Sequence, residues 1–297
     1  MIKTITNRGK VVFNNITRQF NDYLSKNNLS PSKSILLYWD NYGSDNYLIE
    51  DDPNKYITNI IRKYTNYISD KKRCSNLVRE LNLNQHYPLT FNTKNDIINK
   101  DDNSIYFLKE KFGTMCRGVQ CISHKNLKNL IIPENKVIQE GIVNIKLIDQ
   151  KKFVIRCYII IYNKNIYLSK YAYCAIFNKN FDSSKTDHNI QVCEPKERHF
   201  LELHQSEYSN YIFKIRDALK YMKPLFDPII KQSSETKYTI IGPDVLITSD
   251  NKIKFIEFNS FPNLCHSSMN KNVIDKMLLD LYKLVFLNIK LDNMMLV

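Results

Sequence analysis

The segment from Lys151 to Phe177, KKFVIRCYIIIYNKNIYLSKYAYCAIF, restricts the fold more than any other part of this chain. It is rich in β-branched and aromatic residues, and its clearest turn signal is Asn163-Lys164-Asn165. Such a composition favours strands over helices because these side chains pack well on a pleated surface. The segment therefore predicts two or three long strands joined by a tight turn.

From Ser104 onward the chain is mainly strand-like, with two helical runs. Further strand-like runs are SIYFLKEK, GVQCI, KVIQEGI and the hairpin GPDVLITSDNKIKFIEFN. The run NYIFKIRDALKYMKPLF has helical apolar spacing, and a terminal helix is expected from about Asn272. Residues 178–210 are polar and irregular, which indicates a mobile loop. Strands with flanking helices predict an α+β fold.

The N-terminal part of the chain is richer in Asn and charged residues. The run from Ser32 to Asp40 predicts a buried strand, and Asn54 to Ile68 has helical apolar spacing. The run CSNLVRELNLN predicts a short helix that ends before Pro88. We therefore expect three parts: a smaller N-terminal lobe over residues 1–80, a central lobe over 81–142 and a C-terminal lobe over 143–297.

Composition excludes several classes of protein. No run of about 18 apolar residues is present, and the start of the chain lacks the apolar stretch of a secretion signal. The seven cysteines are scattered without a C-x-x-C pair, which favours a reducing compartment over a disulfide framework or a zinc site. We therefore expect a monomer without a membrane segment, located in the cytoplasm, or in the host cytoplasm or virion if the protein is viral.

The net charge of +13 has two interpretations. It fits an anionic partner such as nucleotide phosphates, an acidic peptide or a nucleic acid. It also fits the lysine bias of an AT-rich genome, since Asn, Ile, Lys and Tyr are all abundant. The charge alone does not choose among these partners.

The hairpin from Gly242 to Asn259 carries polar residues where a core strand would not hold them unpartnered. A two-residue turn at Asp250-Asn251 would pair Ser249 with Lys252 and place Asp244 opposite Glu257. Strand alternation then gathers one set of side chains on a single face: Thr248, Leu246, Asp244, Ile253, Phe255, Glu257 and Asn259.

Two carboxylates and an amide would thus converge at one end of that face. Like charges directly opposite each other repel unless a cation lies between them, and Mg²⁺ takes carboxylate and amide oxygens together with substrate phosphates. The alternative is purely structural: Glu257 pairs with one of the lysines, and Asn259 caps the turn before Pro262.

Two further segments carry cations that suit phosphate. The run YFLKEKFGTMCRGVQCI places Lys109 at a strand end before a loop with Gly113, Thr114 and Gly118, whose backbone N–H groups could approach a phosphate. Its spacing fits neither a P-loop nor a dinucleotide fingerprint. The strand KKFVIRCYIII places Lys152, Val154 and Arg156 on one face, which fits either an anion site or a solvated basic surface.

Taken in order, these segments resemble the tubulin–tyrosine-ligase-like branch of the ATP-grasp superfamily. Its K-P-x-x-x-S-x-G-x-G-I loop is similar to KEKFGTMCRGV, its V-V-Q-K-Y-I strand to VIQEGI, and its K-F-D-x-R strand to KFVIR. Its G-x-D and E-x-N-x-x-P elements match GPD and IEFNSFP, and RCSNLVREL with YPLTFN resembles its K-x-x-L and P-x-T-F segment. The resemblance covers roughly residues 70–270.

The resemblance implies ATP bound between two α+β lobes and a role for each matched residue. ATP-binding positions would be Lys109, Thr114, Gly118, Gln139, Glu140, Ile142 and Lys152, with Gln139 reading adenine. The Mg²⁺ ligands would be Asp244, Glu257 and Asn259, and the catalytic residues Arg156 and Glu257. The chemistry would be ligation of a carboxylate to an amine through an acyl-phosphate, with ATP and Mg²⁺ as cofactors.

The sequence departs from the family pattern at several positions. Glu140 and Gly141 replace a lysine and an aromatic residue, Val154 replaces an aspartate, and Cys116 replaces a loop glycine. The arginine expected near Cys174 is missing, and Lys170 or Arg198 are the candidate substitutes. The function that we expect is that of an enzyme that adds an amino acid or amine to a protein or peptide carboxylate. The alternatives are an inactive relative that serves as a nucleotide- or protein-binding scaffold, and a basic nucleic-acid-binding protein.

Overall fold

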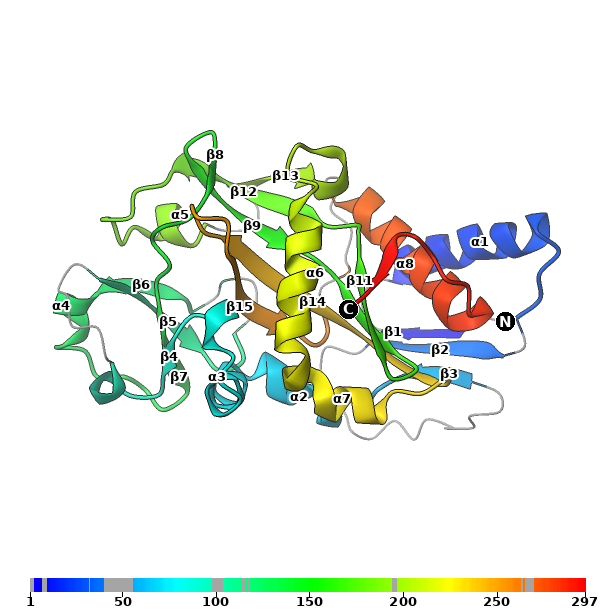
Figure 1. Ribbon diagram of the computed structural model, residues 1–297, viewed down its shortest axis with the longest axis horizontal. Coiled ribbons are helices and arrows are strands. Elements are labelled where there is room, and N and C mark those ends of the chain that lie inside the picture. Colours follow the sequence, from blue (N-terminus) through cyan, green and yellow to red (C-terminus); the bar gives the residue numbers. More distant parts are fainter. Residues whose placement is uncertain are drawn as a thin grey trace.

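The computed structural model describes residues 3–6, 10–31, 33–39, 56–97, 104–113, 116, 118–193, 197–262, 264 and 270–297. Its elements are arranged as two β-sheets with helices packed against them (Figure 1). In chain order they are β1 (Lys3–Thr6), α1 (Lys10–Lys26), β2 (Ser34–Trp39), β3 (Tyr56–Asn59), α2 (Arg62–Ser69), α3 (Lys71–Glu80), η1 (Asn84–His86), β4 (Thr90–Phe91), η2 (Lys94–Asp96), β5 (Ile105–Glu110), β6 (Gln120–Ser123), α4 (His124–Leu127), β7 (Lys136–Glu140), β8 (Leu147–Ile148), β9 (Lys151–Arg156), β10 (Ile159–Tyr162), β11 (Asn165–Ser169), β12 (Tyr173–Asn180), α5 (His188–Gln191), β13 (Arg198–Glu202), η4 (Leu203–Gln205), α6 (Tyr211–Met222), η5 (Lys223–Phe226), α7 (Asp227–Gln232), β14 (Lys237–Ile247), β15 (Ile253–Asn259), α8 (Lys271–Leu287) and β16 (Met294–Leu296).

Among the described residues, the larger sheet has twelve strands and is organised around β14. The first half of β14 pairs with β3 and β10, and its second half, from Gly242, pairs with β15 and β9. The strands β1, β2, β3 and β14 run parallel to their neighbours in that order, and β14 is antiparallel to β9, β10 and β15. One strand therefore links the N-terminal strands to the hairpin that carries Asp244 and Glu257.

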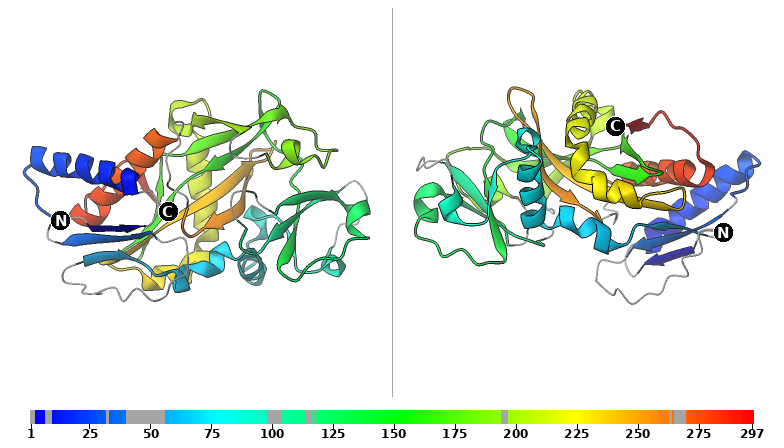
Figure 2. Two further views of the ribbon diagram at one scale, coloured as in Figure 1. Left: turned by 180° about the vertical axis from the view of Figure 1, so that it is seen from behind. Right: turned by 60° about the horizontal axis from the view of Figure 1, so that its bottom comes forward.

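Helices cover both faces of this sheet (Figures 1 and 2). On one face, buried residues of α6, α7 and α2 pack against Ile155, Ile241 and Phe255. On the other face, α1 and α8 pack against Tyr158, Ile160 and Tyr238. Burying apolar side chains on both faces accounts for the near-continuous apolar character of the run from Lys151 to Phe177.

The smaller sheet has four strands in the order β4-β7-β5-β6 and lies beside the larger one, at the left of Figure 1. Its own core comprises seven buried residues: Phe91, Ile97, Tyr106, Leu108, Ile122, Leu127 and Ile138. In the part of the chain that the structure describes, no strand pairs with both sheets. The candidate site lies where side chains of β5 and β7 meet those of β9, β14 and β15.

The α+β class is confirmed, and three local predictions need correction. The segment 151–177 contributes to four strands, β9 to β12, rather than two or three. The run from Asn54 to Ile68 is not one helix, because β3 pairs with β14 before α2 begins at Arg62. Residues 178–210 are not an irregular loop: Asp187 caps α5 by accepting from the N–H groups of Asn189 and Ile190, and β13 follows.

No helix among the described residues is both long enough and apolar enough to cross a membrane.

Candidate functional site at the junction of the two sheets

The hairpin register places Asp244 directly opposite Glu257, which confirms the predicted pairing. Two differences from the prediction cancel each other. The turn has three residues between Thr248 and Lys252, with Asn251 in the left-handed conformation at a φ of 62°, rather than two residues. A β-bulge between Asp244 and Val245 then shifts the register by one residue and restores the pair.

The bulge also changes which apolar residues accompany the polar group. Val245, Ile247, Ile253 and Phe255 belong to the core under α6. Ile253 and Phe255 were predicted on the face of Asp244, and that prediction is wrong, because an extra residue reverses the alternation of a strand. Leu246 lies on the face of Asp244, as predicted, and away from the core under α6. It belongs to a smaller apolar group called the Val154 cluster here: Ile145, Val154, Phe177, Cys193 and Leu246, with Ile142, Leu147, Phe181 and Ile256 at its edge.

Each carboxylate of the pair has a basic partner. The guanidinium of Arg156 donates from Nε to Oδ1 of Asp244 at 2.7 Å and from Nη2 to Oδ2 at 2.9 Å. The Nζ of Lys71 lies 3.3 Å from Oε1 of Glu257 and donates to the carbonyl of Gly113 at 3.1 Å. These cations offset the repulsion between facing carboxylates. The sequence-based alternative, a lysine partner for Glu257, is therefore present in the form of Lys71.

Asn259 completes the polar group at the end of β15. Its Nδ2 donates to the carbonyl of Gly242 at 3.2 Å, which leaves Oδ1 as the atom suited to a cation. The approach is tight because a Cβ on Gly242 would lie 2.5 Å from Cβ of Pro262. Glycine is thus required where β14 passes under the turn that follows β15.

The donor chemistry of this group fits a hard divalent cation. Asp244, Glu257 and Asn259 offer two carboxylates and an amide oxygen, the ligands that Mg²⁺ accepts alongside phosphate oxygens. Carboxylate oxygens carry more than one lone pair, so Arg156 and Lys71 can remain nearby. The described residues contain no cluster of three or more His, Cys, Asp or Glu side chains, so the protein alone offers only a partial coordination shell.

The predicted phosphate lysines lie next to this group and are both buried. Lys109 is 8% exposed and donates to Oε1 of Gln139, and Lys152 is 5% exposed and donates to the carbonyl of Gln191 at 2.7 Å. The Nζ of Lys109 lies 5.7 Å and that of Lys152 5.2 Å from the ring centroid of Phe107. The predicted common face of Lys152, Val154 and Arg156 agrees with the packing, because Phe153 and Ile155 lie in the opposite core.

Burial makes both lysines weaker bases than usual. Loss of solvation lowers the pKa of Lys109 to about 8, and the nearby Glu257 carboxylate opposes part of this effect. Loss of solvation, with the charge of Lys109 next in importance, lowers the pKa of Lys152 to about 7. Among the described residues, neither lysine forms an ion pair with a carboxylate. Buried cations without an acidic partner are unfavourable unless an anion joins them.

Arg198 from β13 is a third cation at this place. It lies opposite Phe177 in the β12–β13 ladder, with its Cζ 5.2 Å from that ring centroid. Its Nη2 donates to Sγ of Cys116 at 3.0 Å. The sequence named Arg198 and Lys170 as alternatives for a missing arginine. Lys170 lies between β11 and β12, where its N–H donates to Asn293, whereas Arg198 stands beside Lys152.

Three residues predicted to bind ATP lie on or after β7: Gln139, Glu140 and Ile142. Gln139 is buried and bonds to Lys109, and its Nε2 donates to Oγ1 of Thr90. Glu140 is half-buried, burial raises the pKa of its carboxyl, and Lys254 partly offsets this. Ile142 packs at the edge of the Val154 cluster. Strand alternation directs Gln139 toward Lys109 and Glu140 to the opposite face of β7, so the acidic replacement does not face the phosphate lysines.

The remaining departures also have a local reason. An aromatic side chain cannot replace Gly141 without movement, because a Cβ there would lie 2.6 Å from Cγ1 of Ile105. Val154 is part of an apolar wall rather than a polar site. Gly118 has a φ of 68°, a conformation that favours glycine at the entry to β6. Thr114 lies outside the described residues.

Sequence reasoning missed Lys71. Asp70 caps α3 by accepting from the N–H groups of Lys72 and Arg73, and Lys71 at the start of that helix reaches Glu257. The local pattern SDKKR contains an N-cap signal, but nothing in it identifies a partner in β15.

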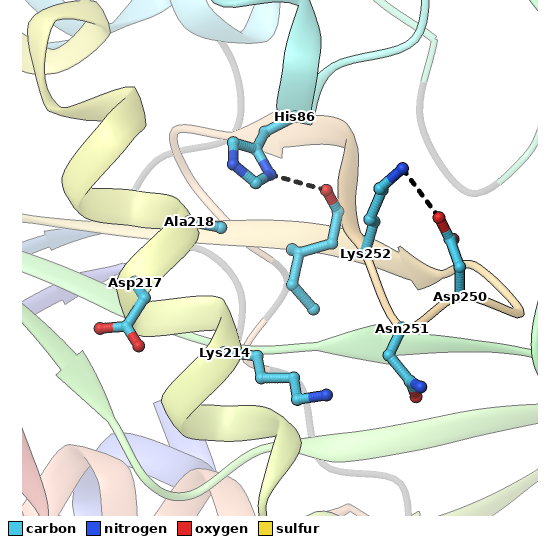
Figure 3. A pocket seen from close by; sticks show the side chains of 8 residues that line it. His86, Lys214, Asp217, Ala218, Asp250, Asn251 and Lys252 are labelled. Atoms are coloured by element: carbon cyan, nitrogen blue, oxygen red, sulfur yellow. Dashed lines mark hydrogen bonds and ion pairs between the residues drawn. The ribbon is translucent and has the colours of Figure 1, made fainter.

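A separate shallow pocket of about 380 Å³ lies at the tip of the hairpin, between α6 and η1 (Figure 3). Its polar edge includes His86, Asp217 and Asp250, and His86 Nδ1 lies 2.9 Å from the carbonyl of Ile253. Asp250 lies six positions after Asp244, which is about 20 Å along β14 and the turn. The pocket is therefore not part of the polar group described above.

Comparisons with known proteins identify the architecture. No family model and no curated protein matches the sequence. Among solved structures, the C-terminal domain of K. lactis Pby1, described as an ATP-grasp enzyme interacting with the mRNA decapping enzyme Dcp2, has a TM-score of 0.66 and 16% identity over 97% of this chain and 94% of that chain. At this identity the likeness concerns the fold. The chain has the α+β fold of ATP-grasp proteins.

Proposed function

We propose that this protein is an ATP- and Mg²⁺-dependent ligase that joins a carboxylate to an amine through an acyl-phosphate. One observation carries the proposal: Lys109, Lys152 and Arg198 lie together without an acidic partner among the described residues, next to a carboxylate pair that suits a divalent cation. Five basic side chains and two carboxylates meet here, when Lys71 and Arg156 are included. The surplus of positive charge fits a polyphosphate.

ATP would lie between the two sheets. Lys109 and Lys152 would contact its phosphates, with backbone N–H groups of the loop before Gly118. Its adenine ring would pack against the Val154 cluster, which provides apolar side chains from both sides of the junction, including Ile142 and Leu246. The bonds of Gln139 to Lys109 and Thr90 fix its amide, which would lie near the ring.

Asp244, Glu257 and Asn259 would hold Mg²⁺. When bound, the ion would neutralise charge on the phosphates and orient them for attack. Arg156 is fixed by its double hydrogen bond to Asp244 and would stabilise the charge that develops on the transferred phosphoryl group. Glu257 thus has two functions in the proposal, as a metal ligand and as the partner that fixes Lys71.

The reaction would take place in two displacements. A carboxylate oxygen of the acceptor attacks the γ-phosphorus, ADP leaves, and the acyl-phosphate forms. The amine nitrogen then attacks the acyl carbon, loses its proton, and expels phosphate, which yields the amide. The resemblance of the motifs to tyrosine-ligase-like proteins favours a protein or peptide carboxylate as acceptor and an amino acid as donor. That the Pby1 domain is described as interacting with another protein is consistent with a protein partner.

A screen of ADP release tests this function. Purified protein with ATP and Mg²⁺ is incubated with carboxylate peptides and single amino acids, and ADP and the mass of the product are measured. We expect ADP release that requires both substrates and the metal. Tight ATP binding without ADP release across the panel would instead support a nucleotide-binding scaffold. Steep salt-dependent binding of RNA or DNA that Asp244→Asn leaves unchanged would support a nucleic-acid-binding protein.

ATP binding should take up protons near neutral pH. The free protein has a pKa of about 7 at Lys152 and about 8 at Lys109, and a bound polyphosphate would raise both values. Affinity is therefore expected to be greatest below pH 7 and to fall as the pH rises through 7–9. Calorimetry at pH 8 in buffers of different ionisation enthalpy measures the uptake. An affinity independent of pH over this range would contradict the placement of ATP beside these lysines.

A further inference from the structure

Arg198 stands out because it joins two segments that belong to different sheets. Its Nη2 donates to Sγ of Cys116, which follows β5 of the small sheet, at 3.0 Å. The same atom donates to the carbonyls of Cys193 at 2.7 Å and Val192 at 3.1 Å, and Nε donates to Cys193 at 3.2 Å. These four hydrogen bonds use three acceptors, namely two main-chain carbonyls and one thiol, and a thiol is a weak acceptor for a guanidinium.

The two cysteines that Arg198 contacts both have unusual backbones. Cys116 has a φ of 61° and Cys193 a φ of 53°, which is the left-handed region that residues other than glycine rarely adopt. Strained residues of this kind persist when surrounding contacts hold them, and they gather at ligand sites. Here Cys116 follows β5 of the small sheet and Cys193 precedes β13 of the larger one, and Arg198 bonds to both.

Arg198 and Lys152 share their surroundings. Both cations lie over the ring of Phe177, with Nζ of Lys152 5.5 Å and Cζ of Arg198 5.2 Å from its centroid. Both also use main-chain carbonyls of the three residues from Gln191 to Cys193. The charge of Arg198 contributes to the low pKa of Lys152. Two cations held this close by neutral groups repel each other, and an anion between them would remove that repulsion.

We propose that Arg198 is a further phosphate-binding residue of the nucleotide site, contributed by β13, and that it exchanges its contact with Cys116 for the phosphates of ATP. The planar guanidinium can keep its bonds to the carbonyls of Val192 and Cys193 while another N–H edge meets an anion. The thiol of Cys116 is the weakest of its partners and would be the first replaced. This inference rests on the proposed function only for the identity of the nucleotide.

Binding of three ligands to Arg198→Met and Arg198→Lys tests this inference. Calorimetry with ATP, adenosine and inorganic tripolyphosphate should show about a 10- to 100-fold loss of affinity for both phosphate compounds in Arg198→Met, and little change for adenosine. Arg198→Lys keeps the charge and should recover part of the loss. Arg216→Met is the matched control, because Arg216 also stacks on a phenylalanine but lies on α6 beside Asp217.

The reactivity of Cys116 gives a second measurement that does not depend on turnover. Alkylation by iodoacetamide, followed at the Cys116 peptide by mass spectrometry, should change in rate in Arg198→Met, because the thiol loses its guanidinium partner. It should also change when ATP binds to the wild-type protein, because Arg198 then leaves the thiol. An alkylation rate unaffected by either change would overturn the exchange of partners.

The outcomes separate this inference from the proposed function. Equal losses for ATP and adenosine would make Arg198 a structural residue, even if ligase activity is found. Tripolyphosphate binding that depends on Arg198, without ADP release by the wild type, would support the phosphate contact and count against the ligase. Failure of the wild type to bind either phosphate compound would overturn both.

Discussion

Replacement of Glu257 by glutamine is expected to lower ATP turnover by about 10²- to 10³-fold or more, because it removes the charge of a proposed metal ligand from the carboxylate pair. The substitution keeps the shape of the side chain. Lys71 should retain its hydrogen bond to the carbonyl of Gly113, so Gly113 should stay in place. ADP release is measured at saturating ATP over a range of Mg²⁺ concentrations.

The control for this change is Glu235→Gln, which alters an exposed carboxylate in the connection between α7 and β14. Circular dichroism and thermal unfolding of both variants show whether the fold is kept. We expect ATP binding without metal to change little in Glu257→Gln, whereas the effect of Mg²⁺ on that binding should be lost. Turnover within about 10-fold of the wild type would argue against Glu257 as a metal ligand.

Replacement of Lys152 by methionine is expected to stabilise the ligand-free protein and to abolish ATP binding. Lys152 is 5% exposed, and the centroids of three phenylalanine rings lie within 5.9 Å of its Nζ. It forms no ion pair with a carboxylate among the described residues. Methionine has a similar length and no charge to desolvate. The free energy of unfolding in urea should rise by roughly 1–3 kcal/mol at pH 7. Affinity for ATP should fall by about 100-fold or more.

Both effects are needed to identify a binding residue. If Lys152 served only the fold, its replacement would destabilise the protein and leave the affinity for ATP unchanged. The matched control is Lys125→Met in α4, where the side chain is exposed and neither quantity should move. Loss of stability in Lys152→Met, with ATP binding retained, would show that the cation is held for structural reasons.

Much of the fold was accessible from local patterns, because strand alternation and turn residues act over a few positions. The face shared by Lys152, Val154 and Arg156 followed from alternation alone. The Asp244–Glu257 pair was predicted correctly through a turn of the wrong length, because a bulge restored the register. A bulge has no dependable sequence signal here, so the apolar residues that flank the pair could not be assigned.

The other parts of the site depend on contacts across long stretches of chain. Lys71 meets Glu257 through the placement of a helix, and Arg198 meets Cys116 over 82 residues of sequence. No pattern within a single helix or strand predicts such long-range contacts. The resemblance of motifs identified a missing arginine, and packing favours Arg198 over Lys170 as its proposed substitute.

The separation of the two sheets determines which half of the site is fixed. β14 ties Asp244 to the N-terminal strands through a continuous ladder, whereas the described strands β4 to β7 pair only among themselves. The small sheet therefore carries Lys109 and Gln139 as one body, held to the other half by side chains such as Arg198 and by single backbone bonds, among them Lys71 N–H to Lys111. A nucleotide could enter if the small sheet tilts, and this motion would break no strand pairing in the larger sheet. We expect Asp244, Glu257 and Lys152, which belong to the larger sheet, to stay in place while Lys109 and Gln139 move with the small sheet.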